Sequence, residues 1–349
     1  MSVTIKDVAK KANVSPSTVS RVISNSDKIS EATKKKVRKI MGELGYYANL
    51  NARMLVQKST KTIGVVMKHS TSEAMHNPFF PELLSGISAE CHKKDYSLML
   101  TTGSSEESIY NEVVKMVQGK LVDGIIVTYS KLDDRVVPYL QNIDIPFVVI
   151  GKPAENSHAI MHIDNDNVFG GMEATEYLIE LGHRRIGFVG DDPEYQVVQD
   201  RIAGFKNTMQ KHAIEIPEHY IQLGSWSSGL NEDVLDLFFK KEPYPTALIA
   251  TTDTIGLYLL SALDSRNIKV PNDISVLSFN NTLISQIATP NMTSVDIQTF
   301  QLGFEAAKSV IELIKEPDAF KKSIIIPTMI IERTSTKELT KETPKYKQL

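Results

Sequence analysis

Two kinds of apolar pattern divide the chain. Near the N-terminus, Ile5, Val8, Ala9 and Ala12 fall at the i, i+3, i+4, i+7 spacing that gives a helix one apolar face. Beyond residue 62, runs of consecutive apolar residues alternate with amphipathic stretches. Such runs are typical of parallel strands that helices cover on both faces. The pattern therefore predicts a small all-α head followed by an α/β body.

Capping residues mark the helices of the head. Thr4-Ile-Lys-Asp7 has the form of a capping box at the start of the first helix. Ser15 followed by Pro16 predicts the start of a second helix, because the missing proline N–H costs nothing at the first helical position. A third helix is expected from about Ser30 to the glycine at position 45.

The second predicted helix carries small polar residues and Arg21 on its exposed positions. Two short helices joined by a tight turn are typical of a helix-turn-helix, whose second helix enters the major groove of DNA. Small side chains would let the backbone approach DNA, and Arg21 can reach a guanine edge or a phosphate. A generic three-helix bundle is the alternative on these features alone.

Charge is distributed unevenly along the 349 residues, whose formal net charge is −3. Residues 1–58 hold 12 lysines and arginines against 4 acids, a charge of +8, so the remainder carries −11. A basic head on an acidic body fits a head that binds phosphates. A solvated lysine-rich helical surface would give the same balance, so charge does not decide the function.

The strand pattern of the body divides near residues 159–164, with similar strand–helix units on either side. It predicts two doubly wound lobes, with late segments that cross back between them. Such folds bind ligands at the carboxyl ends of their strands, here in a cleft between the lobes. The predicted strands are 63–67, 98–101, 124–127, 147–150, 186–189, 247–250 and 274–279, and the late segments are 293–297, a helix over 300–314, and 324–331.

Residues 4–25, TIKDVAKKANVSPSTVSRVISN, resemble the N-terminal signature of the LacI/GalR family nearly residue for residue. The resemblance covers residues 3 to about 334 and is strongest in the head. It implies a sequence-specific transcriptional repressor with an N-terminal all-α helix-turn-helix head and a periplasmic-binding-protein-like α/β body of two doubly wound parallel-sheet lobes. Because one helix-turn-helix reads only a half-site, a homodimer on pseudo-palindromic, double-stranded operator DNA is expected.

The segment from Tyr46 to Leu55 resembles the family's hinge, in which a short helix forms on operator DNA and a leucine enters the minor groove. Leu55 occupies the wedge position, and such a wedge offsets the cost of unstacking by bending the duplex against more protein surface. Packing of Leu55 against the body is the alternative. The residues expected to face DNA are Thr4, Ser15, Pro16, Ser17, Thr18, Ser20, Arg21, Asn25, Tyr46, Ala52, Arg53 and Leu55.

Loops after the strands are where the resemblance implies effector binding. The stretch 200–205 resembles a family motif whose arginine makes bidentate contacts to sugar hydroxyls, which nominates Arg201. Trp226, the single tryptophan, stands where the family often places a stacking aromatic ring. A salt bridge or core packing is the alternative for these two residues. The expected effector-binding residues are Phe79, Phe80, Lys152, Arg201, Trp226, Thr252, Asp253 and Asn280.

Three of these positions depart from the family pattern. Thr252 replaces an amide, Asn280 replaces a carboxylate, and Lys152 lies where several members carry an acid. Hydrogen-bonding capacity is kept, but the ligand's identity cannot simply be carried over from other members.

Further strings narrow the resemblance, namely residues 77–80, 150–152, 164–167 and 278–281. With the head and hinge they look most like maltose-operon repressors of low-GC Gram-positive bacteria, which implies a small sugar effector, maltose or a maltodextrin. One alternative is a global carbon-catabolite-type regulator that uses a protein corepressor. Another is a free-standing sugar-binding protein, which would need a secretion signal and no basic head.

Signatures of an enzyme are missing from the sequence: it has no HExxH, Walker loop, GxSxG, or GxGxxG after a strand. Cys91 lies in a helical pattern without an evident activating base, and His158 and His162 lie in an extended setting that disfavours chelation. No metal or cofactor is therefore expected. One cysteine, no secretory apolar region and no apolar run of about 18 residues predict a soluble cytoplasmic protein without a membrane partner.

The expected domain organisation places the helix-turn-helix in 1–48 and the hinge helix and linker in 49–61. The polar residues 335–349 lack leucine heptads and are expected to form a flexible tail rather than a tetramerising coiled coil. The first lobe is expected to take 62–160 with a return segment 293–320, and the second lobe 161–292 with 321–334.

Overall fold

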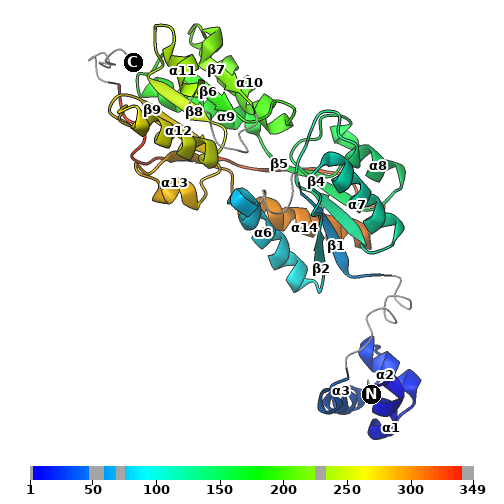
Figure 1. Ribbon diagram of the computed structural model, residues 1–349. Coiled ribbons are helices and arrows are strands. Elements are labelled where there is room, and N and C mark those ends of the chain that lie inside the picture. Colours follow the sequence, from blue (N-terminus) through cyan, green and yellow to red (C-terminus); the bar gives the residue numbers. More distant parts are fainter. Residues whose placement is uncertain (1–2, 47–58, 68–74, 225–232, 340–349) are drawn as a thin grey trace. The chain divides into compact units, whose positions relative to one another are not determined.

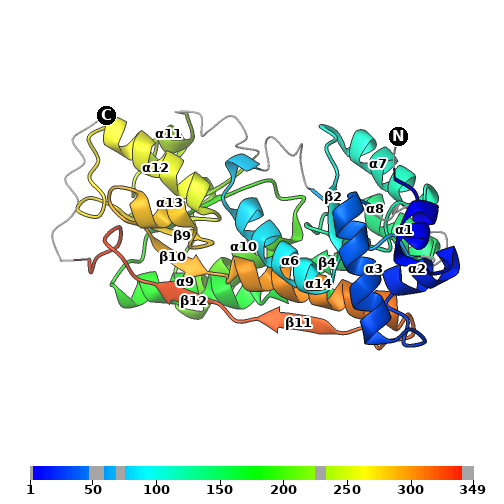
Figure 2. The same cartoon turned by 90° about the horizontal axis from the view of Figure 1, so that it is seen from below.

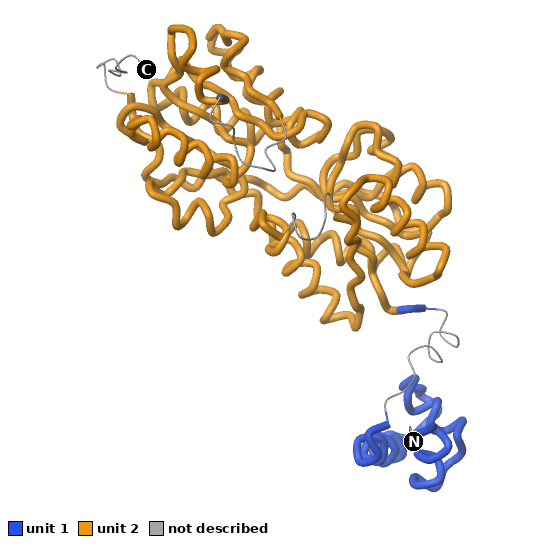
Figure 3. Tube along the Cα trace, viewed as in Figure 1, with its two compact units in different colours: residues 1–60 blue, residues 61–349 orange. Residues whose placement is uncertain are grey.

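A computed structural model of the chain describes residues 3–46, 59–67, 75–224 and 233–339. They fall into two units, one within residues 1–60 and the other within 61–349 (Figure 3).

The head consists of three helices, α1 (Ile5–Ala12), α2 (Pro16–Ile23) and α3 (Glu31–Leu44). The Asp7 carboxylate accepts hydrogen bonds from the backbone N–H and the hydroxyl of Thr4, at 2.9 and 2.7 Å. Ser15 caps α2 by accepting from the Thr18 N–H at 3.1 Å. All three predicted helices are confirmed. Their shared core is made of Val8, Ala9, Ala12, Val19, Val22, Val37 and Ile40.

The body contains two six-stranded sheets (Figure 1), which confirms the predicted pair of doubly wound lobes. The first sheet has the order β11-β5-β4-β3-β1-β2 and is parallel throughout. The second has the order β12-β10-β9-β8-β6-β7, and only its edge strand β12 runs antiparallel. The strands are β1 (Thr62–Val66), β2 (Ser97–Leu100), β3 (Gly124–Val127), β4 (Phe147–Ile150), β5 (His162–Asn165), β6 (Ile186–Gly190), β7 (Ile221–Leu223), β8 (Ala247–Ala250), β9 (Ser275–Phe279), β10 (Thr293–Asp296), β11 (Ser323–Ile326) and β12 (Met329–Ile331).

Helices cover both faces of each sheet. In the first lobe α6 and α14 lie on one face and α7 and α8 on the other, and in the second lobe the pairs are α9 with α10 and α11 with α12. The helices of the body are α6 (Phe79–Lys93), α7 (Glu106–Gln118), α8 (Val136–Asn142), α9 (Asn167–Glu180), α10 (Gln196–Lys211), α11 (Asp233–Phe239), α12 (Asp253–Ser265), α13 (Leu283–Ile287) and α14 (Thr299–Lys315), with 3-10 turns at Ser157–Ala159 and Glu218–Tyr220.

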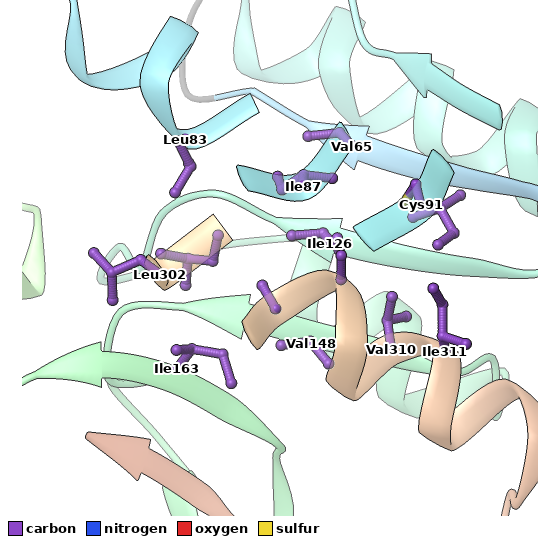
Figure 4. Packing of buried hydrophobic residues seen from close by; sticks show 14 of the residues in the cluster. Val65, Leu83, Ile87, Cys91, Ile126, Val148, Ile163, Leu302, Val310 and Ile311 are labelled. Carbon is purple, nitrogen blue, oxygen red and sulfur yellow. The ribbon is translucent and has the colours of Figure 1, made fainter. Parts of the chain in front are cut away.

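The core of the first lobe joins distant parts of the sequence. Helices α6 and α14 lie side by side (Figure 2), and their apolar side chains meet those of the sheet. Figure 4 shows Leu83 and Ile87 of α6 on one side of Ile126 of β3, and Leu302 and Val310 of α14 on the other side in this view. Each such buried side chain contributes about 1.5–3 kcal/mol relative to an exposed one.

The chain crosses between the lobes after β5, between β10 and α14, and between β11 and β12, as the sequence predicted for its late segments. The sequence assigned three segments to the wrong lobe. Residues 162–165 and 323–326 belong to the first sheet, and 293–296 belong to the second. The apolar run 324–331 was expected as one piece, but Pro327 lacks a backbone N–H and separates two short strands that join different sheets.

The expectation of a flexible tail from residue 335 is also wrong for its first part. Ser335 is fully buried, and its hydroxyl donates to the Val276 carbonyl at 2.6 Å and accepts from the Thr293 N–H at 2.8 Å. The Leu339 N–H donates to the Leu181 carbonyl at 2.7 Å. Hydroxyl groups in this polar segment satisfy backbone groups of β9 and β10, which hydropathy alone does not reveal. The rest of the expected tail, 340–349, lies outside the described residues.

Candidate functional site

A cavity lies between the two sheets of the body. Its walls come from the carboxyl ends of strands in both lobes, which is where doubly wound folds bind ligands. Six of the eight predicted effector-binding residues line it, namely Phe79, Phe80, Lys152, Arg201, Thr252 and Asn280. Trp226 lies outside the described residues.

Asp253 is the predicted residue that does not line the cavity. It is 1% exposed, and its carboxylate accepts hydrogen bonds from the hydroxyls of Ser278 and Ser294, at 2.6 and 2.8 Å, and from the backbone N–H and hydroxyl of Thr282. Burial raises the pKa of Asp253, and these donors oppose that rise. Asp253 therefore holds β9, β10 and the start of α13 together beneath the cavity.

Arg201 is buried on α10 and held by groups from two other elements. Its Nε donates to the Asn167 Oδ1 at 3.0 Å, its Nη1 donates to the Thr251 carbonyl at 2.6 Å, and its guanidinium stacks 4.3 Å from the Phe279 ring centroid. Burial lowers the pKa of Arg201 to about 10, and nearby Asp164 opposes that shift. Arg201 is thus a buried cation packed against Phe279 at the cavity wall, as the core-packing alternative expected, and its contact with a ligand stays a prediction.

Two glycines allow α9 and α10 to meet closely enough to place Arg201. A Cβ at Gly204 would lie 2.1 Å from the Val168 carbonyl oxygen, and one at Gly171 would lie 2.3 Å from the Arg201 carbonyl oxygen. Any larger residue would separate the helices. The backbone of Arg201 is therefore set directly by helix packing.

Sequence reasoning missed the polar residues at the carboxyl end of β5 and the start of α9. Asp164 and Asn167 are buried, line the cavity, and are joined by a hydrogen bond from Asn167 Nδ2 to Asp164 Oδ1 at 2.9 Å. Burial raises the pKa of Asp164 to about 7, and the nearby Asp200 adds to the rise. A polar pair after a short buried apolar run was the available signal, but β5 was not among the predicted strands.

Aromatic rings provide the apolar surface of the cavity. Phe79 and Phe80, at the start of α6, pack edge to face with centroids 5.1 Å apart. Tyr129, after β3, and Tyr195, before α10, lie on its wall as a second edge-to-face pair. The two tyrosines were not predicted, because neither follows a motif that marked it.

Three more predicted residues, Lys152, Thr252 and Asn280, also lie at the cavity. Lys152 is exposed at the cavity rim after β4, whereas Asn280 is buried after β9 with φ of 103°. The Thr252 hydroxyl caps α12 by accepting from the Ile255 N–H at 3.2 Å. Thr252 thus caps a helix and also lines the cavity.

In the head, α2 presents the polar face that the sequence predicted. Ser15, Pro16, Ser17, Ser20 and Arg21 are exposed, as is Thr4 before α1. Thr18 is half-buried, with its hydroxyl 2.9 Å from that of Ser15.

Two further predicted DNA-facing residues take part in packing or bonding within the head. The side-chain oxygen of Asn25 accepts from Arg38 Nη2 at 2.7 Å, and Tyr46 packs against the apolar core. The hinge residues Ala52, Arg53 and Leu55 lie outside the described residues.

Three other features were checked in the described parts of the chain: the cysteine thiol, metal-ligand clusters and membrane-spanning helices. Cys91 is buried, and this burial raises the pKa of its thiol to about 12, far from a reactive thiolate. Among the described residues no three histidine, cysteine or acidic side chains gather as metal ligands. Within the same residues, no helix combines the length and apolarity needed to cross a membrane.

Comparison with known proteins assigns the family. Residues 4–49 match the model for bacterial regulatory proteins of the lacI family, and residues 175–336 match a periplasmic binding protein-like domain. The chain is 37% identical over 335 residues to the HTH-type transcriptional regulator MalR of Staphylococcus xylosus, covering 96% of this chain and 98% of that one. The chain belongs to the LacI family.

Solved structures of LacI-family regulators share the fold of this chain. A putative LacI transcriptional regulator from Bacillus cereus subsp. cytotoxis is 41% identical, with a TM-score of 0.77 over 80% of this chain and 99% of that one. The regulator CelR in complex with cellobiose is 27% identical, with a TM-score of 0.74 over 95% and 99% of the two chains. As a LacI-family member, the chain is a DNA-binding transcriptional regulator and not an enzyme.

Proposed function

We propose that this LacI-family regulator is a repressor whose affinity for operator DNA is controlled by maltose or a maltodextrin bound in the cleft. The observation that carries the proposal is the make-up of the cavity. It combines a fixed cation, buried carboxyl and amide groups, and aromatic rings at the carboxyl ends of the strands.

This combination suits a neutral polyhydroxyl ligand. Asp164 and Asn167 offer acceptors and donors beside Arg201, whose hydrogen bonds with described residues use Nε and Nη1 and leave Nη2 for a ligand. The rings of Phe79 and Tyr195 offer apolar surface for the C–H face of a sugar. The resemblance to MalR and the cellobiose in the CelR complex support a disaccharide of glucose.

In the head, we assign DNA reading to the exposed face of α2. Arg21 would contact a guanine edge, while Ser15, Ser17 and Ser20 would let the helix backbone approach the groove. Thr4, Pro16, Thr18, Asn25 and Tyr46 would support this face from its edges. Ala52, Arg53 and Leu55 complete the proposed contact as hinge and minor-groove wedge.

A homodimer is part of the proposal, because a pseudo-palindromic operator presents two half-sites. Leu283 and Ile287 on α13 are 62% and 69% exposed, and Leu257 on α12 is also exposed. Apolar side chains so exposed in one lobe suit a contact with a second copy. Sugar in the cleft would favour one orientation of the lobes, which changes the spacing of the two hinges and lowers operator affinity. Such a regulator acts where the DNA is, in the bacterial cytoplasm.

A gel-shift experiment with a sugar panel tests the proposal. The DNA should come from upstream of the chain's own gene and of its neighbours, and the sugars should include maltose, maltotriose and a galactoside. We expect specific retardation that maltose or maltotriose relieves and the galactoside does not. Retardation without any response to millimolar maltose would remove the sugar assignment and leave the DNA-binding regulator standing.

A further inference from the structure

One side chain joins the three segments that cross between the lobes. Asn165 ends β5, where the first crossing begins, while Ile297 follows β10 in the second crossing and Ile326 ends β11 before the third. Figure 2 shows this third crossing between β11 and β12. The Asn165 Nδ2 donates to the Ile297 carbonyl at 3.0 Å and to the Ile326 carbonyl at 2.9 Å. A single amide group therefore ties all three crossings together.

The partners of this amide fix its orientation. A carbonyl oxygen accepts hydrogen bonds and never donates them, so the atom that lies between the two carbonyls must be the nitrogen. Asn165, Ile297 and Ile326 are all buried. Because buried carbonyl groups without a donor are costly, the two bonds favour the arrangement of the crossings in which both are made.

The same residue belongs to the effector cleft. Asn165 lines the cavity, and its Oδ1 accepts no hydrogen bond from the residues that the structure describes. A sugar hydroxyl is a donor that can supply the missing bond. One end of this amide thus holds the crossings, and the other end is left for a ligand.

A second connection leads from the crossings to the buried cation of the cleft. The Asn167 Nδ2 donates to the backbone carbonyl of Asn165 at 3.3 Å, and the Asn167 Oδ1 accepts from the Arg201 Nε at 3.0 Å. Arg201 is therefore two hydrogen bonds away from the residue that ties the crossings. The crossings are the segments about which the two lobes can turn, so both connections lead from the cleft to the hinge.

We infer that Asn165 is a positioning residue that couples ligand in the cleft to the orientation of the lobes. The inference rests on the proposed control of operator binding by a sugar. A ligand hydroxyl on Oδ1 favours the orientation in which Nδ2 also keeps its two carbonyl partners. Without the amide, the crossings can shift past one another, and a ligand no longer selects one orientation.

Hydrogen–deuterium exchange of the full-length chain without ligand tests the clamp itself. Asn165→Asp keeps the size of the side chain but removes both donors. Backbone amides of residues 163–168, 296–300 and 325–330 should then exchange roughly tenfold faster or more, the factor that corresponds to one lost hydrogen bond, while β3 and β8 exchange as before. Asn142→Asp, exposed at the end of α8, adds the same charge and should leave every segment unchanged. Wild-type exchange rates at the crossings of Asn165→Asp would overturn the inference.

Operator binding with and without saturating maltose tests the coupling. The factor by which maltose lowers operator affinity should fall by roughly tenfold in Asn165→Asp, since such couplings typically amount to about 5- to 150-fold. Calorimetry should still detect maltose binding to this variant. A purely structural role would lower the melting temperature and leave the factor unchanged, which would contradict the inference.

Asn165→Ala provides a second variant should Asn165→Asp not fold. It removes the same two donors without adding a buried charge, and both measurements should change in the same direction. Absence of any maltose response in the wild type would contradict the proposed effector, and the exchange experiment would then decide the inference alone.

Discussion

The guanidinium of Arg201 is bound to the backbone of Thr251, with Nη1 donating to the carbonyl oxygen at 2.6 Å. The acceptor follows β8, while the donor comes from α10, so one hydrogen bond fixes a helix against the carboxyl end of a strand. A cation held in this way is preorganised for a ligand, since little side-chain entropy remains to be lost on binding.

Replacing Arg201 with lysine should therefore weaken the effector response although the charge is kept. Lysine cannot reproduce the planar set of donors that reaches Asn167, Thr251 and the cavity at once. If maltose is the effector, as proposed, loss of one or two charge-assisted bonds, about 1.5–3 kcal/mol each, should lower its affinity by roughly 10- to 100-fold or more. The effector response is measured by the fluorescence anisotropy of labelled operator DNA with the bound protein, titrated with maltose. Arg184→Lys, which changes an arginine bonded to the Ile179 and His183 carbonyls, is the control and should respond normally.

The buried carboxyl of Asp164 should make stability depend on pH. Its pKa is raised from 3.8 to about 7 by burial, so between about pH 4 and pH 7 the folded state binds more protons than the unfolded state. Its contribution to the free energy of unfolding therefore falls as pH rises through this window, by on the order of a few kcal/mol. In Asp164→Asn, the free energy of unfolding measured by urea denaturation should not fall in this way between pH 5 and pH 8. The exposed Asp95→Asn serves as control, and an equal pH dependence in wild type and Asp164→Asn would contradict the argument.

Gly204→Ala should destabilise the body and also impair effector binding. The new methyl group would meet the Val168 carbonyl oxygen at 2.1 Å and force α9 and α10 apart, at a cost of about 1–3 kcal/mol. Gly170→Ala is a matched control on α9, because its methyl would find ordinary contacts at 3.5 Å or more. Thermal unfolding followed by circular dichroism compares the two. Equal melting temperatures would show that the helix contact tolerates a methyl group.

Removing residues 335–349 should destabilise the second lobe, whereas removing 340–349 keeps every contact described for the tail. The longer deletion leaves the Thr293 N–H and the Val276 carbonyl without the Ser335 hydroxyl, and each buried group left unpaired costs about 1–3 kcal/mol. Ser335→Ala isolates this contribution without shortening the chain. The midpoints of urea denaturation rank the three proteins, and an unchanged Ser335→Ala midpoint would mean that water replaces the hydroxyl.

Arg21→Ala should weaken specific operator binding by about 1–3 kcal/mol if its guanidinium reads a base. The side chain is exposed on α2, so the folded head should be unaffected. Competition between operator and base-substituted DNA measures the preference. Lys39→Ala, on the exposed side of α3, should leave that preference unchanged. A uniform loss across all DNA sequences in Arg21→Ala would assign the residue to phosphate contact.

The sequence predicted best what depends on neighbouring residues. The caps at Thr4 and Ser15 and the helix stop at Gly45 act within one turn, so the head could be derived almost completely. Asp164 and Ser335 could not be found in this way. Their roles come from burial and from partners far along the chain, and neither hydropathy nor spacing records such contacts.

In the cleft, too, local sequence predicted some residues correctly and missed those whose partners lie far along the chain. A family motif led to Arg201, but nothing local indicated that Asp253 turns away from the cavity to serve Ser278, Ser294 and Thr282. The substituted positions Lys152 and Asn280 do line the cavity. Which sugar they select depends on how the ligand lies among them, and residue types alone do not determine that.

The three crossings between the lobes have a consequence for synthesis on the ribosome. The first sheet lacks α14 on its face until residue 315 has been made, and it lacks β11 until residue 326 has been made. Every residue of the second lobe up to β10 emerges before the first lobe can close. The apolar face that later receives Leu302 and Val310 therefore lacks α14 through most of translation, so the first lobe cannot be completed until most of the second has been made.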